Sequence, residues 1–227
     1  MFKTTLKTTV AAALLGVSSY ASAAIVQFDL QDVTNSYGFN GTITVADNGL
    51  NNVTVTADIS QANVSLTQGD ILAFGMNILD DNLLPLTSVL PVTGTGTDSA
   101  GNAFTIHTPQ LNFSDCYGAG ACDVFTGGQG SPGKNFDMAF QVGIQGSAQG
   151  FLQTITFGLT GAGLDALDFL GEAGSMRVQS INTATLDDAS SKLVGPSGNV
   201  PEPSILALMG LGLIGLGFAR RQRNRQL

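Results

Sequence analysis

TITVADNGLNNVTVTADI, residues 42–59, is the stretch of this 227-residue chain that decides its fold. Asn48-Gly49 supplies the positive φ angles that tight hairpin turns require. After the turn, apolar residues occupy alternate positions, so one face of that strand points into a core and the other carries threonine and aspartate. The stretch therefore predicts an antiparallel hairpin, whose inward residues on the second strand are Val53, Val55, Ala57 and Ile59.

Short apolar runs separated by turn residues continue on both sides of this hairpin. Val26, Phe28 and Leu30 alternate in the same way. The intervening segments are rich in Gly, Asn, Asp and Pro, as in Gly94-Thr95-Gly96 and residues 127–133, and such residues adopt turn conformations that others resist. Further strands are expected at Ile71–Leu79, Ala103–His107, Phe136–Val142, Phe151–Leu159 and Met176–Ile181.

The fold class follows from the number and spacing of these strands. Eight or more short strands without alternating helices predict an all-β protein, an antiparallel β-sandwich or jelly roll, over residues 24–194. One helical candidate, Leu164–Leu170, has leucine at every third position and is expected as one or two turns at an open end of the sandwich. Nothing indicates an internal repeat or a second domain, so the body is expected to be a single domain.

Residues 1–23 have the organisation of a secretory signal peptide. Lysines near the start precede an apolar run, Val10–Val17, which is too short to span a bilayer as a permanent helix. The small residues Ala21-Ser22-Ala23 then form a cleavage site. We therefore expect signal peptidase to cut between Ala23 and Ala24; the alternative is a buried N-terminal helix.

The body of the chain is strongly acidic. Between Ala24 and Asn199 there are sixteen acidic residues and three basic ones, a net charge of −13, whereas the whole chain carries −8. Binding to nucleic acid relies on Lys and Arg that release counterions from phosphates, so this composition excludes a nucleic-acid partner. It suits an exported protein kept soluble by self-repulsion, or one that collects divalent cations.

Cys116 and Cys122, the only cysteines, lie six residues apart in a loop of Gly and Ala. An even number of cysteines in an exported chain favours a disulfide. Two thiols without neighbouring histidines make a poor zinc site, so metal binding is the weaker alternative. The predicted bridge closes a small loop and stabilises a turn, by about 2 kcal/mol in the loop-closure relation.

Residues suited to catalysis are scarce. His107 is the only histidine, which excludes a multi-histidine metal site, and its place in a strand is typical of a surface or pocket-rim residue. Asp80-Asp81 and Asp187-Asp188 lack the facing geometry of glycosidase carboxylates, because adjacent strand residues point to opposite faces. We therefore assign no catalytic residue, cofactor or metal ligand. Asp115 and Asp123 flank the cysteine loop and leave a calcium site open as an alternative.

The C-terminal residues have the organisation of a membrane-sorting signal. A linker, residues 195–203, ends in Pro201-Glu202-Pro203. Ser204–Ala219 is uncharged; at 1.5 Å per residue a helix of this length spans about 24 Å, and it crosses the bilayer if flanking arginines snorkel. Residues 220–227 are expected to remain cytoplasmic and to leave the body outside, because they contain Arg220, Arg221, Arg223 and Arg225.

This succession of Pro201-Glu202-Pro203, apolar segment and terminal arginines resembles the PEP-CTERM family of sorting signals. The resemblance implies recognition by exosortase, a membrane cysteine protease that cuts near the Pro-Glu-Pro motif. It also implies release or transfer of the body to the surface of a Gram-negative bacterium that makes exopolysaccharide. A weaker likeness to family members extends into the body at Ser131-Pro132-Gly133, residues 177–181 and residues 190–195.

A sorting signal fixes a destination and not a biochemical activity. The expected function is that of an exported, non-catalytic protein of the cell surface or extracellular matrix, associated with exopolysaccharide or biofilm. Its expected partners are signal peptidase, exosortase, the inner membrane as a transient anchor, and exopolysaccharide. The alternatives are a carbohydrate-binding module that grips exopolysaccharide through a concave sheet face and, third, an extracellular hydrolase.

Overall fold

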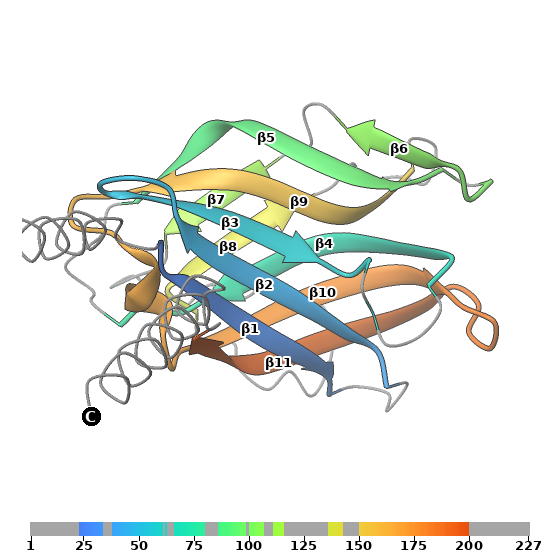
Figure 1. Ribbon diagram of the computed structural model, residues 1–227. Coiled ribbons are helices and arrows are strands. Elements are labelled where there is room, and N and C mark those ends of the chain that lie inside the picture. The colour runs from blue at the N-terminus through green and yellow to red at the C-terminus, as the bar shows by residue number, and fades with distance from the viewer. Residues whose placement is uncertain are drawn as a thin grey trace, which may run out of the picture. The chain divides into compact units, whose positions relative to one another are not determined.

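A computed structural model of the chain describes residues 23–33, 38–60, 62, 66–79, 86–98, 100–106, 111–115, 136–142 and 150–199. The body, Ala24–Val200, is a compact unit with a hydrophobic core of its own. Figure 1 shows how its strands are arranged. Its described part contains eleven strands and a short 3-10 helix. The elements are β1 (Ile25–Asp32), β2 (Asn40–Asp47), β3 (Asn52–Asp58), β4 (Gln68–Met76), β5 (Thr87–Thr97), β6 (Ala103–Ile106), β7 (Leu111–Asp115), β8 (Met138–Val142), β9 (Phe151–Thr160), η3 (Ala166–Phe169), β10 (Ala173–Asn182) and β11 (Ala189–Asn199).

All of these strands belong to one sheet, in the order β6-β5-β9-β3-β2-β1-β11-β10-β4-β8-β7. Every ladder is antiparallel, so the predicted all-β, antiparallel fold is confirmed. The sheet differs from the expected two-sheet sandwich or jelly roll, because β1 and β11 pair with each other, as at Val26 and Asn199, and join the two halves. The first and last strands thus lie in the middle of the sheet.

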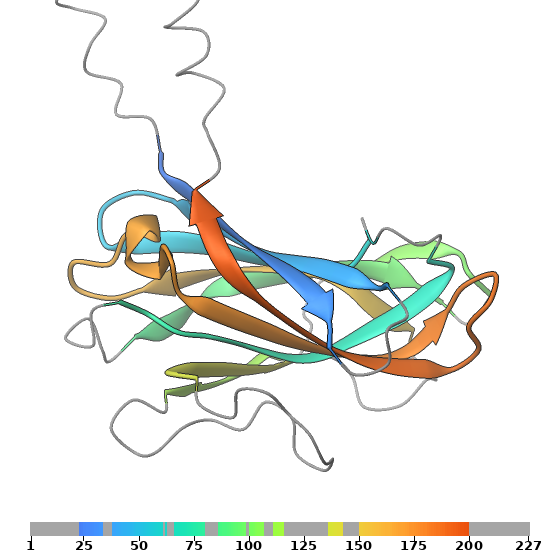
Figure 2. The ribbon, with the colours of Figure 1, turned by 90° about the horizontal axis from the view of Figure 1, so that it is seen from below.

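The sheet curls so far that its two edges approach each other. β6 and β7 lie at opposite edges, yet only five chain steps separate Ile106 from Leu111, which limits the separation of their Cα atoms to about 18 Å. β4 packs against β9 and β5 contacts β7, although neither pair shares a ladder. In Figure 2 the olive β8 accordingly lies on the opposite side of the interior from the blue β2.

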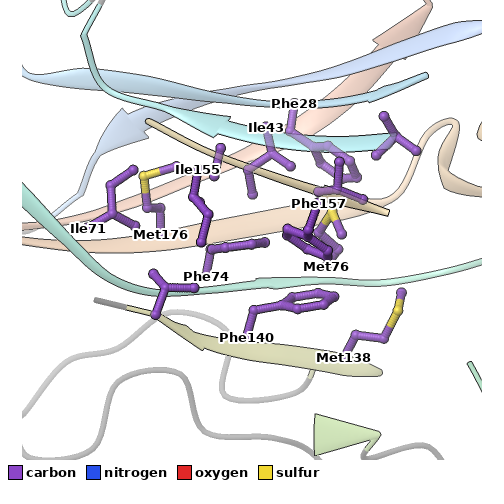
Figure 3. Close-up of a cluster of buried hydrophobic side chains, with 14 of the residues drawn as sticks. Phe28, Ile43, Ile71, Phe74, Met76, Met138, Phe140, Ile155, Phe157 and Met176 are labelled. Carbon is purple, nitrogen blue, oxygen red and sulfur yellow. The ribbon is translucent and has the colours of Figure 1, made fainter. Parts of the chain in front are cut away.

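The concave side of the curled sheet holds the core. At its centre Phe74 of β4, Phe140 of β8 and Phe157 of β9 form an aromatic cluster (Figure 3). Phe74 stacks on Phe140 with ring centroids 4.8 Å apart, and Phe157 lies tilted at 5.0 Å from Phe140. Such pairs contribute about 0.5–1.5 kcal/mol each beyond the burial of their apolar area. The cluster therefore holds the two sides of the curled sheet together.

A bulge and a glycine shape the bend at β10 and β11. The register between these strands shifts between Val178 and Ile181, and Ser180 within the shift has a φ of 50°, which is rare for a residue with a side chain. Gly195 of β11 lies so close to the carbonyl of Asp29 in β1 that a Cβ atom would collide with it. Backbone geometry at these points lets the sheet curl without breaking.

The hairpin predicted at residues 42–59 forms as β2 and β3, and the inward residues predicted on its second strand are fully buried. Gly49 has the expected positive φ, 98°. The second positive φ, 60°, falls on Asn51 rather than on Asn48, because the connection is longer than a two-residue turn. The N–H of Asn48 closes this connection by donating to the carbonyl of Asn52 at 2.9 Å.

Three other segments were assigned from the sequence as turn, linker and helix. Gly94-Thr95-Gly96, expected in a turn, lies inside β5. Residues 195–199, expected as part of the linker, form the end of β11. The helical candidate Leu164–Leu170 contains the single turn η3, whose N-cap Asp165 accepts a hydrogen bond from the N–H of Leu167. Only the last of the three therefore has the expected kind of structure.

Candidate functional site

The start of the first strand of the body and the end of its last strand lie side by side. β1 begins at Ile25, just after the expected cleavage point at Ala23–Ala24, and β11 ends at Asn199, two residues before Pro201. Val26 pairs with Asn199, so these two strand ends are neighbours in the sheet (Figure 2). The start of the expected mature chain and the last residue of the final strand therefore occupy one end of the body.

Asp47, the last residue of β2, ties the start of the body to its neighbours. The N–H of Ala24 donates to Oδ2 of Asp47 at 2.9 Å, and the N–H of Asp47 donates to the carbonyl of Ala24 at 3.0 Å. The other carboxylate oxygen, Oδ1, accepts from the N–H of Ala166, the first residue of η3, at 2.7 Å. A single carboxylate thus connects the start of the body, β2 and η3.

Ser197 fastens β11 at the same end. Its hydroxyl donates to the carbonyl of Phe169 and accepts from the N–H of Glu172 at 3.1 Å. The N–H of Ser197 also donates to the carbonyl of Glu172, at 2.8 Å. These contacts hold the last strand onto the segment around η3, so the chain leaves the body from a fixed point.

The outer face of β2, β3, β9 and β5 carries threonines in register. The hydroxyl oxygens of Thr56 and Thr156 lie 3.0 Å apart and share a hydrogen bond, and the hydroxyl of Thr154 donates to Asp58 at 3.0 Å. These side chains are at least partly exposed, and they form a polar surface made largely of hydroxyl groups. One row of this surface crosses four neighbouring strands as Thr44, Thr56, Thr156 and Thr93.

Asp70 of β4 is a buried carboxylate, only 5% exposed. Its Oδ1 accepts from the N–H of Leu152 at the start of β9, at 3.0 Å, and it lies opposite Gln179 of β10. Burial raises the pKa of Asp70 to about 6, against the lowering effect of its hydrogen bonds with Leu152 and Gln179. Its hydrogen bond with Leu152 makes Asp70 a link between β4 and β9. Among the described residues, no group of three His, Cys, Asp or Glu side chains could hold a metal ion.

A cavity of about 560 Å³ opens at the other end of the β1–β2 pair. Residues 29–32 and 38–41 line it. Asp29 and Asp32 are the charged residues of this described lining.

Most of the residues predicted to form sites lie outside the part of the chain that the structure describes. The disulfide and the membrane segment Ser204–Ala219 therefore stay predictions, and within the described ranges no helix has the length and apolarity to span a bilayer. Sequence reasoning did not single out Asp47, because its partners Ala24 and Ala166 are distant in the sequence. The predicted residues outside the described ranges are His107, Cys116, Cys122, Asp123, Pro201, Glu202, Pro203, Arg220, Arg221, Arg223 and Arg225.

A protein-family model, the PEP-CTERM protein-sorting motif, matches residues 199–223. The match begins at the last residue of β11 and includes the Pro-Glu-Pro triplet, the apolar segment and the first arginines. Neither curated proteins nor solved structures give a match to the chain. The predicted sorting signal is confirmed: residues 199–223 carry a PEP-CTERM protein-sorting motif, which indicates a secreted protein with a C-terminal sorting signal for exosortase processing.

Proposed function

We propose that the body is a non-catalytic component of the cell surface or extracellular matrix, where it associates with exopolysaccharide. One observation carries the proposal: the matched motif begins at Asn199, the residue with which β11 ends. The folded body and the sorting signal thus adjoin without a spacer. A cut near Pro201-Glu202-Pro203 would detach the body as a complete unit, with its last strand held in the sheet.

The chemistry of the tail supports an order of processing. Signal peptidase acts first and leaves a precursor that Ser204–Ala219 anchors in the inner membrane, with the arginines on the cytoplasmic side. Pro201 and Pro203 lack backbone donors and disfavour helix at the residue before each, so the sequence favours an extended peptide next to the membrane. An extended peptide at a fixed height above the bilayer is a suitable substrate for a membrane-embedded protease.

Replacement of Pro201-Glu202-Pro203 by three alanines tests in native cells whether this triplet directs removal of the tail. The expected result is uncut protein in the inner membrane, detected by fractionation and by mass spectrometry of both ends of the chain. Deletion from Ser204 onward should instead send the body unsorted into the periplasm. Asp187→Ala, which removes one negative charge from an exposed connection between β10 and β11, is the matched control and should be sorted normally. Loss of the tail and arrival at the surface at the parental rate in the triple-alanine variant would refute the assignment of the motif as the processing determinant.

A second candidate function is recognition of a polysaccharide. The core fills the concave side of the sheet, so the concave face expected from the sequence is closed to a sugar. The outer threonine rows favour this candidate, because regularly spaced hydroxyl groups donate and accept hydrogen bonds as sugar hydroxyls do.

Saturable, sugar-specific binding of the purified mature protein to exopolysaccharide from the native cells separates the two candidates, because a matrix component can associate with exopolysaccharide without a sugar-specific site. Thr56→Val combined with Thr156→Val removes two hydroxyls without changing side-chain shape, and Thr185→Val in an exposed turn is the control. Saturable binding that the double variant loses and the control keeps supports recognition through this face. Absence of sugar-specific binding supports a matrix role without a sugar site.

A further inference from the structure

We propose that Asp47 is the binding site for the α-ammonium group that signal peptidase creates on Ala24. The inference rests on the predicted cleavage between Ala23 and Ala24, and it goes beyond sorting because it concerns the stability of the mature body. Its basis is the position of the Ala24 nitrogen, which lies 2.9 Å from Oδ2 of Asp47.

Cleavage changes the chemistry of this nitrogen while leaving it in place. Water adds its hydroxyl to the carbonyl carbon of Ala23 as the C–N bond breaks, and the departing nitrogen of Ala24 takes the remaining hydrogen. The new amine binds one further proton from solvent at neutral pH, and the Ala23 carboxyl group loses one. A neutral amide donor facing Asp47 thus becomes a cation facing the same carboxylate.

The surrounding contacts fix Asp47 in the orientation that an ammonium group needs. Oδ1 is occupied by the N–H of Ala166 at 2.7 Å, so Oδ2 is the oxygen presented to Ala24. The Asp47 N–H holds the carbonyl of Ala24 at 3.0 Å, which anchors the residue from its other side. A 2.9 Å separation is within the range of charge-assisted N–H···O bonds, which are about twice as strong as neutral ones.

Stabilisation of the mature start follows from this geometry. The ammonium is added to a body with only three basic residues, and it forms next to a carboxylate that already joins β2 to η3. Because Val26 pairs with Asn199, fixing the start of the chain also supports the strand that leads into the sorting motif. Removal of the signal peptide thereby stabilises the end of the body at which β11 leads into the sorting motif.

A double-mutant cycle on the mature chain, Ala24 to Leu227 in detergent, isolates the contact. One arm begins at Ala24 and the other carries one extra glycine before it, which restores a neutral peptide N–H at Ala24 and moves the same ammonium about 3.8 Å along the chain. Each arm is prepared with Asp47 and with Asp47→Asn, which keeps an acceptor for Ala166. Thermal unfolding is followed by circular dichroism.

We expect the extra glycine to lower Tm by about 2–6 °C when Asp47 is present, and by much less in the Asp47→Asn background. The same fall in both backgrounds, or no fall in either, would overturn the proposal, as would N-terminal sequencing of the exported protein that begins elsewhere than Ala24. If Asp47→Asn does not fold, the glycine extension alone still tests the contact, because it leaves Asp47 intact, and an unchanged Tm is then decisive against it. Failure here would leave the triple-alanine test of sorting unaffected.

Discussion

Asp70→Asn should change how the stability of the body depends on pH. Burial raises the pKa of Asp70 from its ordinary 3.8 to about 6. In the folded state this carboxyl group therefore holds its proton at pH values where the unfolded chain has lost it. The stabilisation that results is complete below the unfolded pKa and is lost as pH rises through the folded pKa. Asparagine keeps the carbonyl acceptor for the N–H of Leu152 and has no proton to lose.

The magnitude follows from the size of the shift. A difference of about two pKa units, at about 1.36 kcal/mol each, corresponds to about 3 kcal/mol of unfolding free energy. Relative to Asp70→Asn, the parental protein should therefore lose about 2–3 kcal/mol between pH 4 and pH 7. Urea unfolding of both proteins at several pH values, followed by circular dichroism, measures this difference.

Comparison between variants is needed because many other carboxylates titrate in the same range. Asp187→Asn removes an exposed carboxylate and serves as the control for the loss of one negative charge. Asp70→Asn should differ from this control in the change of unfolding free energy between pH 4 and pH 7. Equal pH dependence in the parental protein and in Asp70→Asn would refute the reasoning, because burial of the charge would then carry no free energy.

Two further substitutions test the core and the bend of the sheet, and a labelling experiment tests the cysteines. Phe74→Ala removes a ring that stacks on one aromatic neighbour and contacts another. It should lower the free energy of unfolding, measured by urea titration, by about 3–5 kcal/mol. A loss below about 1 kcal/mol would contradict a packed interior. Gly195→Ala places a methyl group against the carbonyl of Asp29 and should lower the free energy of unfolding by more than about 1 kcal/mol. Gly198→Ala is the control, because Gly198 is exposed and a Cβ there meets nothing within 4 Å. Equal effects at both positions would count against the close approach. Cys116 and Cys122 should give no free thiol when the unreduced, unfolded protein is labelled, and two labelled thiols would exclude the bridge.

Local features of the sheet could be predicted from the sequence. Alternation at Val53, Val55 and Ala57 identified the inward face of β3, because side chains alternate between the two faces of a strand. Asn48-Gly49 identified the hairpin, because glycine readily adopts positive φ. Both signals depend only on neighbours in the chain.

Glycines inside strands were harder to interpret. Gly94-Thr95-Gly96 was assigned to a turn because glycine is common there. In β5, however, Gly96 lies where a Cβ would collide with the carbonyl of Phe151 in β9, and Gly195 does the same against Asp29. At these positions glycine permits two backbones to approach closely, and the sequence alone does not distinguish this use from a turn.

Contacts between distant residues could not be predicted either. Asp47 meets Ala24 and Ala166, which are 23 and 119 residues away in the chain, and Asp70 meets Leu152 across 82 residues. The single continuous sheet could not be predicted for the same reason, because the strands that pair at its centre, β1 and β11, are the first and last in the chain. The sorting motif was identified because its residues are contiguous and their order alone defines the signal.

The central position of β11 sets a time at which the body can finish folding. A chain exported from its N-terminus delivers β1 first and β11 last, yet these two strands are neighbours in the middle of the sheet. Until Ala189–Asn199 has crossed the membrane, β1 lacks one of its partners and β10 cannot connect to it. The next residues to arrive are those of the sorting motif, so we expect the sheet to be completed as the proposed membrane segment reaches the bilayer. We therefore expect the protease to meet a body that has only just closed.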